Sequence, residues 1–115
     1  MRCIIVDDSE EFLASASRLL GSQGMEVLAV ASTGDHALRL AGELGPDVAL
    51  VDIELGKEDG IELSHALASR MPATRVVLIS SYERDAFGDL IANSPAAGFL
   101  AKTDLGVTAI ARLLR

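Results

Sequence analysis

Five short runs of hydrophobic residues are spread along the chain, and within each run the apolar residues are consecutive rather than alternating with polar ones. A strand with one face in water alternates, whereas a strand covered on both faces of a parallel sheet is apolar throughout. The pattern therefore predicts five buried parallel strands. They fall at residues 3–6, 27–31, 48–51, 75–79 and 98–101.

The segments between these runs carry apolar residues at the spacing of about 3.6 residues that an amphipathic helix requires. Strand and helix alternate along the whole chain, so we expect a doubly wound α/β domain of three layers. The fourth helix is the least apolar. The predicted helices are 12–20, which stops at Gly21; 37–44, which stops at Gly45-Pro46; one from Ile61 to near Met71-Pro72; about 85–94; and 105–114.

The chain has 115 residues, which is long enough for one domain with a single core. No linker or repeat divides it, so residues 1–115 are assigned to one domain. The last predicted helix runs to Arg115 without a cap or tail, which suggests one domain of a longer protein.

The net charge of −7, the scattered Lys and Arg residues and the aromatic content of 3% argue against direct binding of nucleic acid or of an anionic membrane. The single cysteine, Cys3, lies within an apolar run, so we expect a buried, inert thiol in a reducing compartment. No run reaches the length of a signal-peptide core or a membrane span. These features together predict a soluble, cytoplasmic protein.

Polar side chains follow four of the five predicted strands. Carboxyl ends of parallel strands meet at one edge of a sheet, so these side chains should share one crevice. Only Ala, Ser and Thr follow the second strand, which places it best at the outer edge and gives the strand order 2-1-3-4-5. The residues at the strand ends are Asp7 and Asp8, then Asp52, then Ser80 and Ser81, and finally Lys102.

Three carboxylates in one crevice repel one another, by roughly 4 kcal/mol per pair at about 4 Å and an effective dielectric constant of about 20. Lys102 supplies one positive charge, and a divalent cation would supply the remainder. Oxygen ligands without His or Cys favour Mg²⁺, with Mn²⁺ as an alternative. We therefore predict that Asp7 and Asp8 form a metal-binding site.

This combination resembles the response-regulator receiver domain of bacterial two-component (phosphorelay) signalling, over the whole chain. The resemblance implies the flavodoxin-like form of the doubly wound fold and a phosphoacceptor, with at most self-phosphorylation and self-dephosphorylation, rather than an enzyme. The matching features, in chain order, are Asp7-Asp8, Asp52, Leu55-Gly56 with Asp59-Gly60, Ser80, and Phe99-Leu100-Ala101-Lys102.

The resemblance implies that Asp52 accepts a phosphoryl group from a phosphohistidine of a sensor histidine kinase or phosphotransfer protein, or from a small acyl phosphate. Lys102 would then pair with the phosphoryl oxygens, and the Ser80 hydroxyl would donate a hydrogen bond to them. Such a reaction depends mainly on positioning and on neutralisation of charge.

By the same resemblance, Mg²⁺ would be held by Asp8, by the Asp52 carboxylate and by the backbone carbonyl of Glu54. Asp7 would act partly through water. Glu54 and Tyr82, each two residues beyond a site residue, stand where the family tunes the lifetime of the phosphoryl group.

The family also implies a conformational switch. Phosphorylation adds a charge of about −1.5 to −2 and would draw Ser80 inward. Phe99, three residues before the lysine, would move into the vacated space. The surface that responds would comprise the fourth helix, the fifth strand and the fifth helix.

Two positions depart from the common family pattern. Gly56 stands where many receivers carry proline, and Thr103 follows the lysine where many carry a proline preceded by a cis bond, so a trans bond is expected here. The sequence around Lys102 resembles that in the receivers of helix-turn-helix (LuxR/NarL-like) transcription factors. The output domain of such a factor would be missing from this chain. Phosphorylation-dependent homodimerisation is left open.

Other functions remain as alternatives. A receiver that is no longer phosphorylated could serve as a fixed interaction module. A phosphatase of the haloacid-dehalogenase type needs a second aspartate two residues after the nucleophile, whereas Ile53-Glu54 follows Asp52. A dinucleotide- or flavin-binding domain needs a glycine-rich loop after the first strand, where this chain is acidic.

Simpler structural roles are also open for several of these residues. Asp7-Asp8-Ser9 could be a turn and helix cap, and Asp59-Gly60 is expected to be a turn and helix start. Phe99 could be an ordinary core residue. Asp47 begins its strand and should be a turn residue at the opposite edge of the sheet.

Overall fold

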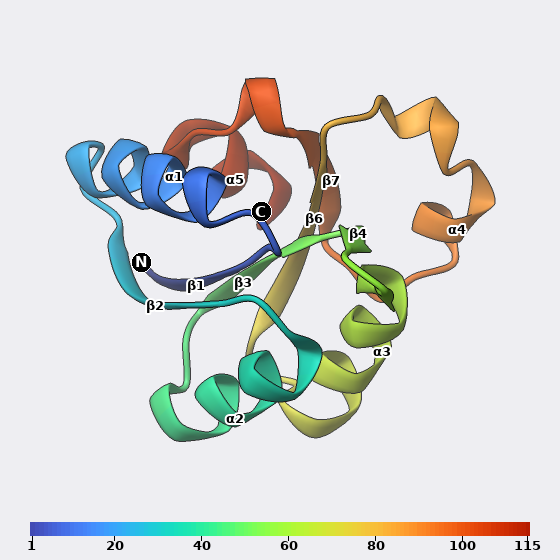
Figure 1. The fold of residues 1–115 in the computed structure, drawn as a ribbon, viewed down its shortest axis with the longest axis horizontal. Coiled ribbons are helices and arrows are strands. Elements are labelled where there is room, and N and C mark those ends of the chain that lie inside the picture. The colour runs from blue at the N-terminus through green and yellow to red at the C-terminus, as the bar shows by residue number, and fades with distance from the viewer.

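The computed structural model, which describes residues 1–115, contains a five-stranded parallel sheet of order β2-β1-β3-β6-β7 (Figure 1). Since β6 and β7 are the fourth and fifth strands of this sheet along the chain, the predicted order 2-1-3-4-5 is confirmed. The strands are β1 (Arg2–Val6), β2 (Glu26–Ala31), β3 (Val48–Asp52), β6 (Arg75–Ser80) and β7 (Gly98–Ala101).

Helices cover both faces of the sheet and form the two outer layers (Figure 1). One face carries α1 (Glu10–Ser22) and α5 (Val107–Leu113), and the other carries α2 (Gly34–Leu44) and α3 (Gly60–Arg70). The three-layer α/β architecture predicted from the hydrophobic pattern is therefore confirmed. No helix combines the length and the hydropathy that a membrane-spanning segment needs.

Successive residues of the inner strands pack into two separate cores. In β1, Ile4 and Val6 contact the α2 and α3 side, whereas Cys3 and Ile5 contact the α1 and α5 side. Side chains alternate across a strand, so a strand with helices on both faces must be apolar at every position. β2 departs from this expectation: it lies at the sheet edge and leaves Val30 exposed.

Local signals in the sequence set four of the helix ends. Ser9, Thr33 and Asp59 cap α1, α2 and α3, and each side chain accepts a hydrogen bond from a backbone N–H of the first turn. Gly45 ends α2 in the left-handed region with φ 56°. Helix α1 continues through Gly21 to Ser22, beyond the predicted stop.

The predicted helix at 85–94 is wrong in extent. The structure has a 3₁₀ turn at Arg84–Ala86 and a single helical turn, α4 (Asp89–Ala92). Gly88, with φ 49°, interrupts the helix between them. This segment has few apolar residues to bury, and Ile91 is the one buried side chain between residues 81 and 97.

Two features near the carboxyl edge of the sheet differ from a plain strand–helix alternation. A short antiparallel hairpin, β4 (Glu54–Leu55) and β5 (Glu58–Asp59), precedes α3 and was not predicted. A 3₁₀ turn at Lys102–Asp104 delays the start of α5 to Val107. All peptide bonds are trans, as expected for the bond before Thr103.

Candidate functional site

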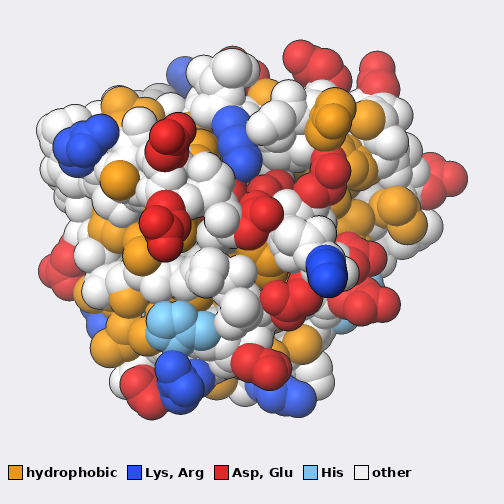
Figure 2. All heavy atoms as spheres, viewed as in Figure 1, with side chains coloured by type: hydrophobic (Ala, Val, Ile, Leu, Met, Phe, Trp, Pro, Cys, Tyr) orange, Lys and Arg blue, Asp and Glu red, His pale blue; other side chains and the backbone are white.

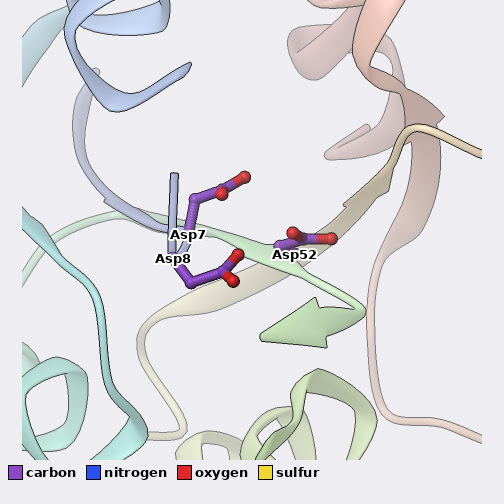
Figure 3. Close-up of side chains that lie close together, drawn as sticks. All are labelled: Asp7, Asp8 and Asp52. Atoms are coloured by element: carbon purple, nitrogen blue, oxygen red, sulfur yellow. The ribbon is translucent and has the colours of Figure 1, made fainter. Parts of the chain in front are cut away.

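Asp7, Asp8 and Asp52 meet at the carboxyl edge of the sheet (Figure 3). Val6 of β1 pairs with Val51 of β3, so the residues that follow them are neighbours. One carboxylate oxygen from each aspartate lies within 4.8 Å of the others. Asp7 and Asp52 are buried, whereas Asp8 is exposed. The shared crevice predicted from the strand ends is therefore present.

Both carboxylate oxygens of Asp7 are fixed by neighbours. Oδ1 accepts a hydrogen bond from the backbone N–H of Ser9 at 2.8 Å. Oδ2 faces the Lys102 ammonium at 2.6 Å but receives no hydrogen bond of good geometry, although it is completely buried. This oxygen therefore keeps electron pairs for a further cationic partner.

Lys102 reaches across the sheet edge from the turn after β7. Its Nζ lies 2.6 Å from Asp7 Oδ2 and 3.3 Å from Asp52 Oδ2. The same ammonium lies over the ring of Phe12, 4.3 Å from its centroid. The lysine is thus brought to the acids, as its place after the fifth strand predicted.

Burial and charge shift the pKa values of this cluster. Burial, and next the negative charge of Asp7, raise the pKa of Asp52 to about 6, although Lys102 and the Glu54 N–H oppose this shift. For Lys102, burial lowers the pKa, but its contacts with Asp7 and Asp52 outweigh burial and hold the pKa above its usual value. Asp52 is therefore ionised and Lys102 charged at neutral pH.

The cluster fits a divalent cation. Three carboxylates against one ammonium leave two negative charges, and the donors are all oxygen. The buried Asp7 Oδ2 without a well-formed hydrogen bond points to the same conclusion. Such a set suits Mg²⁺ or Mn²⁺ better than metals that prefer nitrogen or sulfur. Asp7, Asp8 and Asp52 could therefore hold a metal ion.

Glu54 contributes a backbone group to this edge of the sheet, and its side chain is exposed to solvent. Its N–H donates to Asp52 Oδ1 at 3.1 Å. The β4–β5 hairpin fixes this residue, and Gly56 at its turn has φ 61° and lies beside Asp8. The role expected for the Glu54 carbonyl stays a prediction.

An open hollow of about 270 Å³ lies above the acids and is also lined by Ser80, Tyr82 and Lys102. Ser80 is buried, and its Oγ accepts a hydrogen bond from the Tyr82 N–H at 3.0 Å. On the face shown in Figure 2, acidic side chains gather at the centre and right, with a basic side chain bordering them. The hollow has room for a small anionic group beside the ammonium.

Phe99 lies in β7 and does not line the hollow. It is partly buried and packs against the core on the α2 and α3 side. Its ring centroid is 6.3 Å from that of Phe87, which in turn is 6.5 Å from that of Tyr82. A row of aromatic rings thus connects Phe99 with a residue at the hollow.

Two contacts of the site were not predicted from the sequence. Phe12 begins the predicted helix 12–20, and its contact with Lys102 depends on how the first turn of α1 lies beside the turn after β7. The exposed Glu58 accepts hydrogen bonds from the Gly34 N–H at the start of α2, at 3.1 and 3.3 Å. No spacing in the sequence connects residues so far apart.

Residues expected to be structural behave as predicted. Asp59 Oδ1 accepts from the Ile61 N–H at 2.8 Å and so begins α3. Asp47 is exposed at the opposite edge of the sheet, where Oδ2 accepts from the Arg2 N–H at 2.8 Å. Cys3 is completely buried, and burial raises the pKa of its thiol to about 11.

Comparison with known families identifies the class. Residues 3–110 match the family described as the response regulator receiver domain, and the chain belongs to that family. The resemblance seen in the strand-end residues is therefore confirmed. Domains of this family generally bind Mg²⁺ and interact with histidine kinases or phosphotransfer proteins.

Individual relatives agree with this assignment. The chain is 31% identical over 103 residues to the response regulator GacA of Pseudomonas aeruginosa, covering 89% of this chain and 48% of GacA. It is 27% identical over 104 residues to the DNA-binding transcriptional activator EvgA of Escherichia coli K12, covering 90% of this chain and 51% of EvgA. The chain thus spans about half the length of these curated relatives.

Among solved structures, the fold is similar to that of a response regulator from Burkholderia pseudomallei with a phosphorylated aspartic acid, a calcium ion and citrate. The TM-score is 0.84 at 29% sequence identity, and the match covers 99% of this chain and 66% of the other.

Proposed function

We propose that this domain is a phosphorylation-driven switch in which Asp52 accepts a phosphoryl group from a histidine kinase or phosphotransfer protein. The observation that carries the proposal is the placement of the Asp52 carboxylate. It lies at the end of β3, faces an open hollow, and has Lys102 Nζ 3.3 Å away and two further carboxylates beside it.

In the transfer, a carboxylate oxygen of Asp52 forms a bond to phosphorus. The bond between phosphorus and the histidine nitrogen of the donor breaks, and its electron pair stays on that nitrogen. With an acyl phosphate, the phosphorus–oxygen bond breaks instead and the carboxylate leaves. Asp52 acts as the nucleophile because it is ionised at neutral pH, with a pKa of about 6.

Asp7, Asp8 and Asp52 would hold Mg²⁺, and the backbone carbonyl of Glu54 would complete the protein ligands. The ion supplies neutralisation of charge on the acids and on the incoming phosphoryl oxygens. The similar protein from B. pseudomallei is described with a phosphorylated aspartic acid and a calcium ion, which supports this role for the acidic cluster.

Lys102 and Ser80 receive the transferred group. The ammonium, already beside Asp52, pairs with a phosphoryl oxygen. Ser80 lines the hollow, and its Oγ now only accepts, from the Tyr82 N–H, so its own hydrogen is free to donate to the phosphoryl group. Both residues already line the hollow.

Movement of Ser80 changes the surface around α4, β7 and α5. The row of rings from Tyr82 through Phe87 to Phe99 lies along this path, so displacement of the loop after β6 alters the packing of Phe99. Tyr82 and Glu54, at the rim of the hollow, control access of water to the phosphoryl group and hence its lifetime.

The output is transcription, through a domain outside this chain, in the cytoplasm. EvgA is a DNA-binding transcriptional activator about twice as long as its match here, which supports a further effector domain. The domain itself carries a net charge of −7 and does not bind DNA directly. It accepts and loses its phosphoryl group but turns over no separate substrate as an enzyme.

The test is intact mass after incubation with acetyl phosphate, with and without Mg²⁺, for the wild type and for Asp52→Asn. A single Mg²⁺-dependent phosphoryl adduct that is absent from the variant supports the proposal. A folded domain without an adduct, also after incubation with phosphorylated histidine kinases, would favour a fixed interaction module.

A further inference from the structure

Phe12 is in direct contact with the ammonium of Lys102. The residue lies in the first turn of α1, is partly buried, and presents the face of its ring 4.3 Å from Nζ. The two carboxylates that pair with Nζ are Asp7 and Asp52, at 2.6 and 3.3 Å. The ammonium is thus held by a ring as well as by two acids.

The backbone of Phe12 is linked to the acids through Ser9. The Phe12 N–H donates to Ser9 Oγ at 3.2 Å, and the Ser9 N–H donates to Asp7 Oδ1 at 2.8 Å. Asp7 Oδ2 faces the same ammonium that contacts the ring. Asp7, Ser9, Phe12 and Lys102 therefore form a closed circuit of contacts, in which the helix cap fixes the backbone of Phe12 and the ring contacts the lysine.

An aromatic ring suits this place better than an aliphatic side chain. The Lys102 side chain is only 17% exposed, so its ammonium has lost most of its water. The negative face of a ring attracts a cation, and this attraction grows as the cation is desolvated. A leucine would exclude water equally well but would not attract the Lys102 ammonium electrostatically.

We propose that Phe12 is a positioning residue for phosphoryl transfer, which holds the Lys102 ammonium at the acids and ready for the incoming phosphoryl group. The proposal rests on the proposed function, because it assigns Phe12 a role in that same reaction. Phe12 does not line the hollow, and its contact with the site is with the Lys102 ammonium.

The ring also limits where the ammonium can go. When Asp52 carries a phosphoryl group, Lys102 must change partners while remaining at the edge of the hollow. A contact that has no single direction, unlike a hydrogen bond, lets Nζ slide from the carboxylate oxygens to a phosphoryl oxygen without release into solvent.

The first experiment replaces Phe12 by mono-, di- and trifluorophenylalanine and measures the rate of the Mg²⁺-dependent adduct with acetyl phosphate. Each fluorine withdraws electron density from the ring face while changing its volume little. We expect the logarithm of the rate to fall in step with the number of fluorines. The midpoint of thermal unfolding of each fluorinated variant controls for an effect of fluorination on folding.

Two natural substitutions accompany this series. Phe12→Leu keeps an apolar side chain without a ring and should slow phosphorylation by about three- to tenfold, the range expected for loss of a cation–π contact. Phe12→Tyr keeps the ring and should restore most of the rate. The midpoint of thermal unfolding of each variant shows whether the domain is folded.

A second measurement does not depend on phosphorylation. The methylene protons next to Lys102 Nζ lie near the ring face and should resonate upfield of those of other lysines in a ¹H–¹³C spectrum of the wild type. This shift should disappear in Phe12→Leu and persist in Phe12→Tyr. Ordinary resonances in the wild type would overturn the contact, and the proposal with it.

The kinetic outcomes separate the two proposals. Equal rates across the fluorinated series and in Phe12→Leu, with normal phosphorylation of the wild type, would overturn the role of Phe12 and leave the proposed function standing. A wild type that forms no adduct from any donor would overturn the proposed function and, since it depends on it, the role of Phe12.

Discussion

The Cα of Gly60 lies directly against the backbone carbonyl of Asp52. A Cβ added at Gly60 would overlap that oxygen and also press on the backbone of Ile53. The Gly60 N–H donates to the Ile53 carbonyl at 2.8 Å, so this approach joins the start of α3 to the end of β3. A residue without a side chain is required here by close packing of two backbones.

We therefore expect Gly60→Ala to lower the free energy of unfolding by about 2 kcal/mol or more, because backbone on both sides must shift. Chemical denaturation measures this. Gly42→Ala is the matched control, since Gly42 lies in α2 with open space around it. That variant should gain roughly 0.5–1 kcal/mol from helix propensity. Equal effects at both positions would contradict the packing argument.

Asp52→Asn should stabilise the domain at neutral pH in the absence of divalent cations. Asp52 has a pKa of about 6 in the folded domain, against an ordinary value of 3.8. Between these values the folded state binds more protons, so stability falls as pH rises from about 4 to 6 and stays lower above that range. The asparagine removes this loss.

The expected gain at pH 7.5 is roughly 2–3 kcal/mol, and the wild type and variant should converge below about pH 4. Denaturation curves across this pH range test the prediction. Asp85→Asn, at an exposed carboxylate, is the control and should leave the pH dependence unchanged. A variant less stable than the wild type at pH 7.5 would show that attraction to Lys102 outweighs burial of Asp52.

Glu58 should stabilise the domain by capping α2 from another element. Its carboxylate accepts from the Gly34 N–H at 3.1 and 3.3 Å, at the positive end of the helix. Glu58→Ala should cost about 1 kcal/mol, and Glu58→Gln, which keeps an acceptor but loses the charge, should cost less. Lys57→Ala in the same turn is the control. Thermal unfolding at low and high salt would show whether the charge contributes.

The Cys3 thiol should be unreactive in the folded domain. It is completely buried, and its pKa of about 11 leaves almost no thiolate at pH 8. Iodoacetamide at pH 8 should leave the native protein unmodified and add one label in denaturant. Rapid labelling without denaturant would indicate that β1 opens readily to solvent.

The sheet and the site at its edge were predictable because each depends on local sequence. Continuous apolar runs mark strands with helices on both faces, and a polar residue after each run marks the edge where chemistry collects. Asp7 and Lys102 directly follow their strands and Asp52 is the last residue of its strand, so the topology alone brings them together. No side-chain packing had to be known.

The remaining features depend on contacts between distant segments. The contact of Phe12 with Lys102 and that of Glu58 with Gly34 join residues from different elements, and neither leaves a periodic signal. The length of the fourth helix was overestimated. Helical spacing of a few apolar residues does not show that a segment packs against the core. Gly88, which takes a positive φ, was a local signal that could have corrected it.

In the segment between β6 and β7, Ile91 is the one buried side chain, and Phe87 and Ala96 add only partly buried contacts with the core. The three inner strands β1, β3 and β6, in contrast, each contribute four buried apolar side chains. The free energy needed to detach this segment locally is therefore a small part of the free energy of global unfolding. Amide hydrogens of residues 82–94 should exchange with solvent long before those of β1 and β3, so the surface around α4 can be reshaped while both cores stay intact.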